Sequence, residues 1–158
     1  MLNAPPTRLA RERTLVASLI TRACLCLSII ASGLALRGYG PDVGLPAFVV
    51  KYGGSLLWGT MVFLLVTMAA PNLSPWRGAL IAGSIAVGVE LFRLVHTPWL
   101  DAFRLTIPGA LLLGRIFSTS NMLAYGVGII LGIWLDRLAT AAFANTRALE
   151  SDGHQSAS

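Results

Sequence analysis

Charged residues are scarce in this sequence. Asp, Glu, Lys and Arg together make up 12% of its 158 residues, whereas about 25% is usual for a soluble globular domain. The apolar share is 55%, and the mean hydropathy is +0.71. This composition excludes a soluble enzyme and a disordered linker, because too few polar residues are present to cover an apolar core or to keep the chain unfolded. It predicts an integral membrane protein.

Lysine, cysteine and histidine are also rare. Lys51 is the single lysine, and the net charge of +5 comes from Arg residues scattered between apolar runs, so we expect no nucleic-acid binding. Cys24 and Cys26 are too close in sequence for a CxxC motif, and His96 and His154 are too isolated for a metal site. A P-loop, a GxSxG motif and a dinucleotide fingerprint are missing. The sequence therefore predicts no metal, no cofactor and no catalytic residue.

Long apolar runs are what the sequence has instead. A helix needs about 20 apolar residues to cross the hydrocarbon core of a bilayer. The runs that approach this length are Thr14–Leu36, Phe48–Ala70, Arg77–His96 and Ser120–Leu135. Leu105–Gly114 has only ten residues and is predicted to form a short or re-entrant segment. The predicted fold class is an all-α membrane bundle with four to five transmembrane segments, of which the fourth is short.

Helix breakers and charges set the boundaries of this bundle. Stretches 37–46 and 96–101 contain Gly or Pro and predict loops. We interpret residues 1–13 as a cytoplasmic N-terminal arm, residues 14–138 as a single transmembrane domain and residues 139–158 as a polar, disordered tail.

Arginine positions predict the orientation. Arg8, Arg11 and Arg13 precede the first apolar run and Arg77 follows the second, which favours a cytoplasmic N-terminus. Arg137 argues for a cytoplasmic C-terminus as well, but five full crossings would put the two termini on opposite sides. The side of the C-terminus and the choice between four and five crossings therefore stay open.

Arg22 interrupts the first apolar run. This interruption argues against a cleaved signal peptide, although a basic start before an apolar run resembles one. Because the following residues are uncharged as far as Leu36, we expect the Arg22 side chain to reach toward the nearer headgroups.

Glu90 is the acid that lies within an apolar run. Placing an acid there costs about 2.5–3.5 kcal/mol on insertion scales, so such a residue usually has a partner. Arg93 lies on the same helical face, and Lys51 and Arg104 are predicted on the same side of the membrane. We treat Glu90, Arg93, Arg104 and Lys51 as a candidate ligand or charge site. One carboxylate and three cations suit an anionic lipid headgroup or a lipid-linked sugar phosphate, and interfacial anchoring is the alternative.

Two glycines favour close packing of the last helix. Gly128 and Gly132 lie one helical turn apart, which lets a neighbouring helix approach closely. The sequence contains 16 Gly, so such spacings also arise by chance. The predicted role of this pair is packing alone.

The order of several short motifs resembles one bacterial family. The motifs are LPAFVVKYGGSLLW at 45–58, VELFR at 89–93, LDAFRLT at 100–106 and YGVGI at 125–129. The chain resembles the "domain of unknown function 2809" family of small membrane proteins over roughly residues 20–132, and it is more faintly similar to VanZ-like proteins. The resemblance implies a multi-pass protein of the bacterial inner membrane without an established activity.

The chain departs from the pattern expected of that family at three positions. Ser55 and Asn121 stand where the family is expected to carry Asp, and Arg93 stands where Gln is expected. If those acids serve catalysis or metal binding in relatives, this chain has lost them. Glu90 and Arg104 are retained, which favours a site built on these two residues.

These observations leave three hypotheses for the function. The leading one is a non-enzymatic cell-envelope protein of the bacterial plasma membrane, whose partners are membrane lipids and a lipid-linked envelope intermediate. The alternatives are a small membrane enzyme acting on lipid headgroups, with Glu90 as general acid or base, and a proton-coupled transport component in which Glu90 titrates. The transport hypothesis requires a homo-oligomer, because five short segments are few for a transporter. A purely structural or assembly role is the plain alternative.

Overall fold

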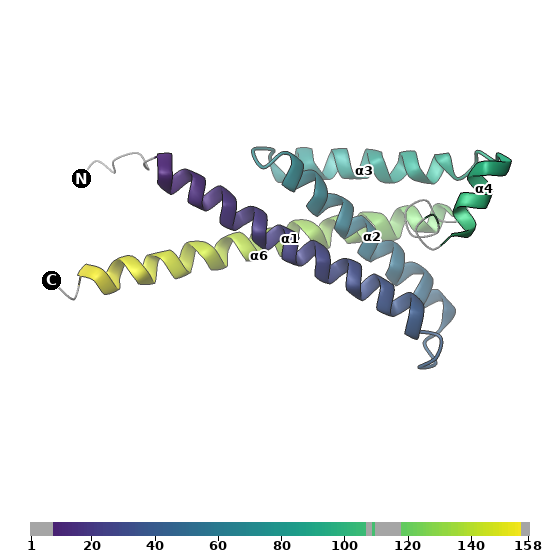
Figure 1. Cartoon of the computed structure of the whole chain (residues 1–158), viewed down its shortest axis with the longest axis horizontal. Coiled ribbons are helices and arrows are strands. Elements are labelled where there is room, and N and C mark those ends of the chain that lie inside the picture. Colours follow the sequence, from purple (N-terminus) through teal and green to yellow (C-terminus); the bar gives the residue numbers. More distant parts are fainter. Residues whose placement is uncertain (1–7, 107–108, 110–117, 156–158) are drawn as a thin grey trace.

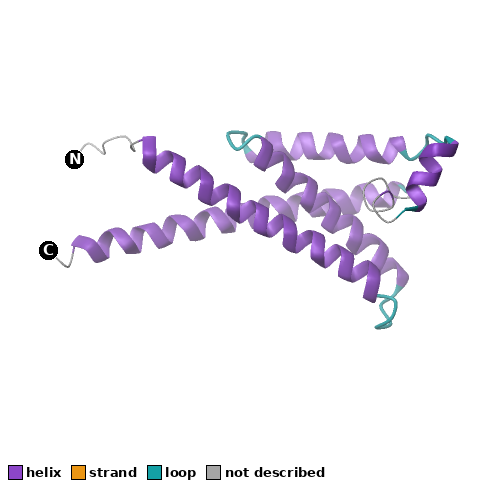
Figure 2. Ribbon diagram, in the orientation of Figure 1, coloured by secondary structure: helices purple, strands orange, loops and turns teal. Residues whose placement is uncertain are grey.

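The computed structural model describes residues 8–106, 109 and 118–155. Within this part of the chain it forms five helices and no strand (Figures 1 and 2). The helices are α1 (Arg8–Tyr39), α2 (Ala47–Ala69), α3 (Pro75–Phe92), α4 (Pro98–Leu105) and α6 (Thr119–Gln155). The all-α prediction is confirmed. Helices α1, α2 and α6 are long and apolar enough to cross a membrane, which marks the chain as a membrane protein.

Helix α2 is the centre of the bundle and packs against α1, α3 and α6. The α1–α2 turn lies at one end of the bundle and the α2–α3 turn at the other, so successive long helices run antiparallel (Figure 1). Gly44 in the first turn has a φ of 79°, a backbone conformation that only glycine adopts readily. Helix α6 runs back toward the start of α1, and both termini lie at the same end of the molecule (Figure 1).

A short helix occupies a stretch that the sequence predicted as a loop. The loop prediction for 96–101 is wrong from Pro98 onward, because α4 occupies Pro98–Leu105. Proline suits the first helical position, where its fixed φ fits and its missing N–H costs no hydrogen bond. Most of the predicted segment Leu105–Gly114 lies outside the described residues.

The long helices extend beyond the boundaries predicted from the sequence. Helix α1 begins at Arg8, before the predicted start at Thr14, and α6 continues to Gln155 through the stretch predicted as a disordered tail. The residues that follow the last apolar run are rich in Ala and contain no helix breaker before Gly153. High helix propensity is therefore sufficient to extend α6.

Helices α2 and α6 pack closely because glycines face the contact. A Cβ atom on Gly128 would overlap the carbonyl oxygen of Leu56, and a Cβ atom on Gly132 would lie 2.8 Å from the ring of Phe63. The hydroxyl of Thr60 donates a hydrogen bond to the carbonyl oxygen of Gly128 at 2.8 Å. The predicted packing role of Gly128 and Gly132 is confirmed.

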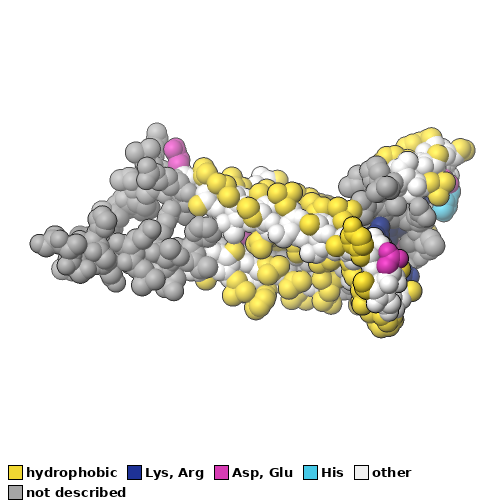
Figure 3. Space-filling view, turned by 60° about the horizontal axis from the view of Figure 1, so that its bottom comes forward, with side chains coloured by type: hydrophobic (Ala, Val, Ile, Leu, Met, Phe, Trp, Pro, Cys, Tyr) yellow, Lys and Arg dark blue, Asp and Glu magenta, His cyan; other side chains and the backbone are white. Residues whose placement is uncertain are grey.

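Apolar side chains cover the outside of the bundle. Figure 3 shows hydrophobic side chains along the middle of one face, with most of the visible charged side chains toward the ends. Large apolar side chains are exposed on every long helix, for example Leu27, Ile30, Leu80, Leu123 and Ile130. Such a surface suits contact with lipid rather than with water.

Candidate functional site

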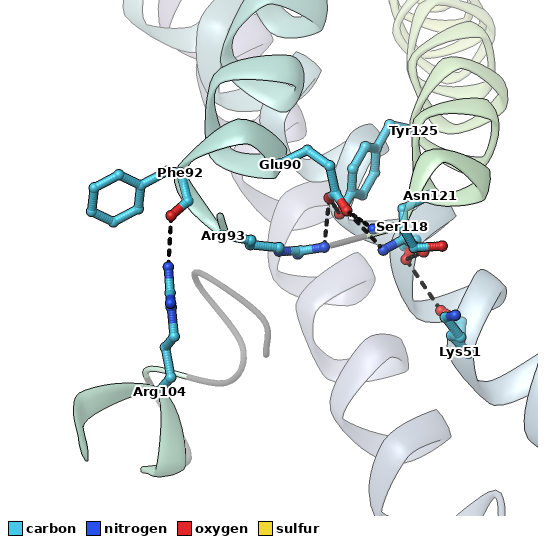
Figure 4. Close-up of polar contacts among 9 residues, drawn as sticks. Lys51, Glu90, Phe92, Arg93, Arg104, Ser118, Asn121 and Tyr125 are labelled. Carbon is cyan, nitrogen blue, oxygen red and sulfur yellow. Dashed lines mark hydrogen bonds and ion pairs between the residues drawn. The ribbon is translucent and has the colours of Figure 1, made fainter. Parts of the chain in front are cut away.

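Glu90 is the centre of a buried polar network at the end of the bundle where α3 finishes and α6 begins (Figure 4). Its side chain is fully buried. It accepts hydrogen bonds from Nη1 of Arg93 at 2.5 Å, the backbone N–H of Ser118 at 2.6 Å, the hydroxyl of Tyr125 at 3.1 Å and Nδ2 of Asn121 at 3.4 Å. A carboxylate offers about four acceptor positions. The four donors therefore satisfy Glu90 completely.

Local sequence explains why these groups meet. Arg93 follows Glu90 by three residues, so both side chains lie on the same face of the α3 terminus. Ser118 immediately precedes α6, and the first N–H groups of a helix lack internal partners and carry the positive end of the helix dipole. The carboxylate of Glu90 supplies both the missing acceptor and the opposite charge.

Asn121 extends the network to α2. Its Oδ1 atom lies 3.3 Å from Oγ of Ser55, and that hydroxyl also lies 3.2 Å from the carbonyl oxygen of Lys51. The carboxylate of Glu90 on α3 thereby contacts α6 directly and α2 through Asn121. The three positions that depart from the expected family pattern, Ser55, Arg93 and Asn121, all belong to this network.

Lys51 does not contribute its charge to the network. Its side chain is exposed and its Nζ lies 5.1 Å from the ring centre of Tyr52. Its contact with the network is made by the backbone carbonyl alone. The part of Lys51 that belongs to the network is thus its backbone and not its ammonium group.

Arg104 closes the end of α3 instead of reaching Glu90. Its guanidinium donates to the carbonyl oxygen of Phe92 at 2.7 Å (Figure 4). It also donates to the carbonyl oxygen of Val95 at 2.8 Å and to the carboxylate of Asp101 at 3.1 Å. The carbonyl groups at a helix end need such donors, and a cation is favourable there. Of the four candidate residues, the structure brings together Glu90 and Arg93.

A cavity of about 340 Å³ lies between α1 and α2 and touches the network. Its polar lining is made by Arg37, Ser55, Arg93 and Tyr125. The rest of its lining is apolar or glycine: Ile29, Ile30, Gly33, Leu34, Gly54, Leu57, Trp58 and Met61. The sequence analysis missed Arg37 as a site residue, because it reads as the ordinary basic end of a transmembrane helix.

The polar and apolar residues that line the cavity lie at different positions along α1 and α2. Arg37 lies in the last turn of α1, and its Nε atom is 3.6 Å from the point where Gly54 would carry a Cβ atom. Ile29 lies about 12 Å deeper along α1, and Met61 lies correspondingly deep on α2. The cavity therefore has a cationic mouth near the α1–α2 turn and an apolar interior toward the middle of the bundle.

A second ion pair lies nearer the termini. Arg22 contacts Asp136 through Nε at 2.6 Å and through Nη2 at 3.0 Å, and its Nη1 donates to the carbonyl oxygen of Thr67 at 3.2 Å. Each side chain is 12% exposed. The expectation that Arg22 reaches toward the headgroups is therefore wrong, because it connects α1 to α2 and α6. Arg22 inside one apolar run and Asp136 directly after another were visible in the sequence, but their pairing could be seen only in the tertiary structure.

The acidic residues do not assemble a metal site in the part of the chain that the structure describes. No group of three or more His, Cys, Asp or Glu residues lies close enough there to hold a metal ion.

Comparison with known proteins identifies one family. A family model described as "Protein of unknown function (DUF2809)" matches residues 44–129, more than half of the chain. The match extends from the α1–α2 turn into α6 and contains every residue of the Glu90 network. The fainter similarity to VanZ-like proteins stays a prediction. No solved structure matches the chain.

Proposed function

This chain belongs to the DUF2809 family of proteins of unknown function, and from its own geometry we propose that it binds an anionic lipid or lipid-linked intermediate without chemical turnover. The binding site is the cavity between α1 and α2. The observation that carries the proposal is the arrangement of two guanidinium groups at the polar mouth of a cavity whose interior is apolar.

The two ends of the cavity match the two ends of an amphiphile. Arg37 and Arg93 carry positive charges that can pair with a phosphate, and among the described residues no acidic side chain lines the cavity. Guanidinium groups form strong, oriented hydrogen bonds with phosphate oxygens. The apolar interior accepts an acyl or prenyl chain, and the volume lies within the usual range of about 300–1,000 Å³ for ligand pockets.

The surroundings of Glu90 favour binding over catalysis or proton transport. Glu90 is fully buried, does not line the cavity, and has its acceptor positions filled. A general acid or base must reach the proton that it moves. The core between Glu90 and the Arg22–Asp136 pair includes the fully buried Phe63 and Leu64, which argues against a polar path along the bundle.

We assign the protein to the bacterial plasma membrane and its role to the cell envelope, with the N-terminus in the cytoplasm. Arg8, Arg11 and Arg13 support this orientation through the positive-inside rule. Helices α1, α2 and α6 are long and apolar enough to span a membrane, and we propose α3, with 18 residues and about 27 Å of helix, as the fourth crossing. Arg137 then lies on the same side as the N-terminus, and the conflict posed by five crossings disappears.

Trp58 provides a direct test because it lines the cavity. The other three tryptophans, Trp76, Trp99 and Trp134, are exposed and are replaced by Phe. The resulting protein is reconstituted in phosphatidylcholine vesicles that contain a small fraction of a lipid with brominated acyl chains, which quench nearby tryptophan. Brominated phosphatidylglycerol is expected to quench Trp58 more strongly than brominated phosphatidylcholine at the same fraction.

Arg37→Gln is the decisive variant, and it should abolish the preference for the anionic lipid. Arg77→Gln is the matched control, because Arg77 is exposed at the opposite end of α3 and does not line the cavity. The proposal would be refuted if brominated phosphatidylglycerol and brominated phosphatidylcholine quenched Trp58 equally in the protein that keeps Arg37.

The envelope role is tested in cells. Deletion of the gene should sensitise the cells to envelope-targeting antibiotics, including glycopeptides. At matched membrane levels, the wild type and Arg77→Gln should restore resistance and Arg37→Gln should not. Restoration by Arg37→Gln would separate the cavity from the envelope phenotype and contradict the proposal.

A further inference from the structure

We infer that α4 is an interfacial helix, whose exposed side lies among the headgroups and outer acyl segments of the bilayer. The partner that this side fits is a lipid surface. The inference goes beyond the proposed function, because it holds whether or not the cavity between α1 and α2 takes a ligand. It follows from the polarity of α4, from its attachment to α3 and from the surface that adjoins it.

The exposed side of α4 is apolar. At the helical repeat of 3.6 residues per turn, one side of α4 is formed by Pro98, Trp99, Ala102 and Leu105. All four residues are exposed and uncharged, and Trp99 is 70% and Leu105 69% exposed. A helix on a water-facing surface shows the opposite pattern, with its polar side chains outward. Water is therefore an unfavourable medium for this side of α4.

The positive charge of α4 turns toward the protein. Arg104 is 3% exposed, and its guanidinium donates to the carbonyl oxygens of Phe92 and Val95 at the end of α3. The guanidinium also lies 5.7 Å from the ring centre of Phe92. No described helix packs along α4, so these contacts are what attach it to α3. The attachment fixes α4 with its apolar side outward.

The exposed side of α4 adjoins an apolar surface at the end of α3. Leu91, Leu94 and Val95 directly precede α4 in the chain, and each is about half exposed. Helix α4 does not continue the line of α3 but turns across it (Figure 1). It therefore lies at one end of the bundle, where a bundle that spans the bilayer meets the headgroup region. Tryptophan is favoured at that depth.

Polar groups border the apolar side of α4. The side chains of His96 and Asp101 are 66% and 45% exposed, and Nδ1 of His96 lies 3.2 Å from Oδ1 of Asp101. These two residues need water or headgroups, whereas Trp99 and Leu105 need an apolar medium. The boundary of a bilayer offers both media within the width of one helix. A protein partner would have to cover both kinds of group and would remove water from the polar ones.

The experiment measures the depth of Trp99 in phosphatidylcholine vesicles. Trp58, Trp76 and Trp134 are replaced by Phe, and the lipid carries bromine either near the headgroup or near the end of its acyl chains. Bromine near the headgroup is expected to quench Trp99 more strongly. A protein that keeps Trp134 alone is the depth reference, because Trp134 is exposed within the apolar span of α6 and should show the reverse order. If the protein that keeps Trp99 alone does not fold, the difference in quenching between the wild type and Trp99→Phe reports the same residue.

Ala102 provides the test variant, because it lies one turn from Trp99 on the exposed side of α4. Ala102→Glu places a charge on that side and should reduce the quenching of Trp99 by brominated lipid and increase its quenching by acrylamide, which acts from the water. Ala102→Leu is the matched control. It keeps the side apolar and should retain the quenching of the unsubstituted protein.

Three results would overturn the inference. Quenching of Trp99 by acrylamide but not by brominated lipid would place α4 in water. Quenching by neither would mean that a second copy or another protein covers α4. Stronger quenching by bromine near the chain ends, or equal quenching in Ala102→Glu and Ala102→Leu, would exclude an interfacial position of this side. None of these results touches the lipid preference measured through Trp58, so the proposed function stands or fails separately.

Discussion

Glu90 carries a negative charge in a position where the surrounding residues make that charge favourable. Arg93 supplies the opposite charge and the start of α6 supplies a backbone N–H. Asn121 and Tyr125 fill the remaining acceptor positions. Removing one partner of a buried ion pair usually costs more than the pair itself contributes, because the other partner stays in a low-dielectric environment. At the scale of single residues, Glu90 is therefore a positioning residue, which holds Arg93 at the cavity mouth.

Replacement of Glu90 by Gln should destabilise the protein by about 3–5 kcal/mol, because a buried cation loses its counter-charge. Unfolding of the purified protein in mixed micelles, followed by circular dichroism, measures this loss. Glu12→Gln is the control, since Glu12 is exposed on α1, and it should stay within about 0.5 kcal/mol of the wild type. The double variant Glu90→Gln/Arg93→Gln should be more stable than Glu90→Gln alone. Wild-type stability of Glu90→Gln would show that the network contributes nothing to the fold.

Each contact between long helices depends on a different kind of interaction. Helix α6 approaches α2 through glycine, α3 meets α6 through Glu90, and α1 is connected to α6 through Arg22 and Asp136. Helix α1 has little buried surface over its apolar stretch compared with α2 and α6. At the scale of elements, α2 and α6 form the closely packed part of the bundle, and α1 lines the other side of the cavity.

Two glycines of α6 provide a matched pair for testing this packing. Gly128→Ala should destabilise the protein by about 1–3 kcal/mol, because its Cβ atom would overlap the backbone of Leu56. Gly126→Ala should stabilise it by up to about 1 kcal/mol, because nothing lies within 4 Å of the added atom and alanine favours the helix. Unfolding in mixed micelles distinguishes the two variants. Equal effects would mean that α2 and α6 do not approach each other at Gly128.

The whole molecule has its two polar regions at opposite ends of an apolar bundle. The Glu90 network and the cavity mouth lie toward the α1–α2 turn, and the Arg22–Asp136 pair lies toward the end that holds both termini (Figure 1). In the four-crossing arrangement that we propose, the mouth faces the membrane surface opposite the termini, and a ligand bound there belongs to the leaflet on that side.

Reporter fusions test this topology. Green fluorescent protein should fluoresce when fused to either terminus, because it folds in the cytoplasm. Alkaline phosphatase inserted after Asp42, in the exposed α1–α2 turn, should be active because it folds outside the cytoplasm. Phosphatase activity at one terminus combined with fluorescence at the other would refute the four-crossing arrangement.

The sequence by itself determined the class of the protein and the features that depend on near neighbours. Apolar runs located the long helices, the spacing of Gly128 and Gly132 indicated close packing, and the spacing of Glu90 and Arg93 placed them on one face. These features were predictable because helical periodicity and bilayer thickness relate residues that are close in the chain.

Only the tertiary structure decided which distant residues meet. Arg22 and Asp136 are separated by 114 positions, and Glu90 lies 28 positions before Ser118. Arg37 reads as an ordinary helix end until α2 and α3 bring Gly54 and Arg93 beside the same cavity. Partners of this kind depend on how the helices rotate and cross, and those angles are set by packing over the whole bundle rather than by any local pattern.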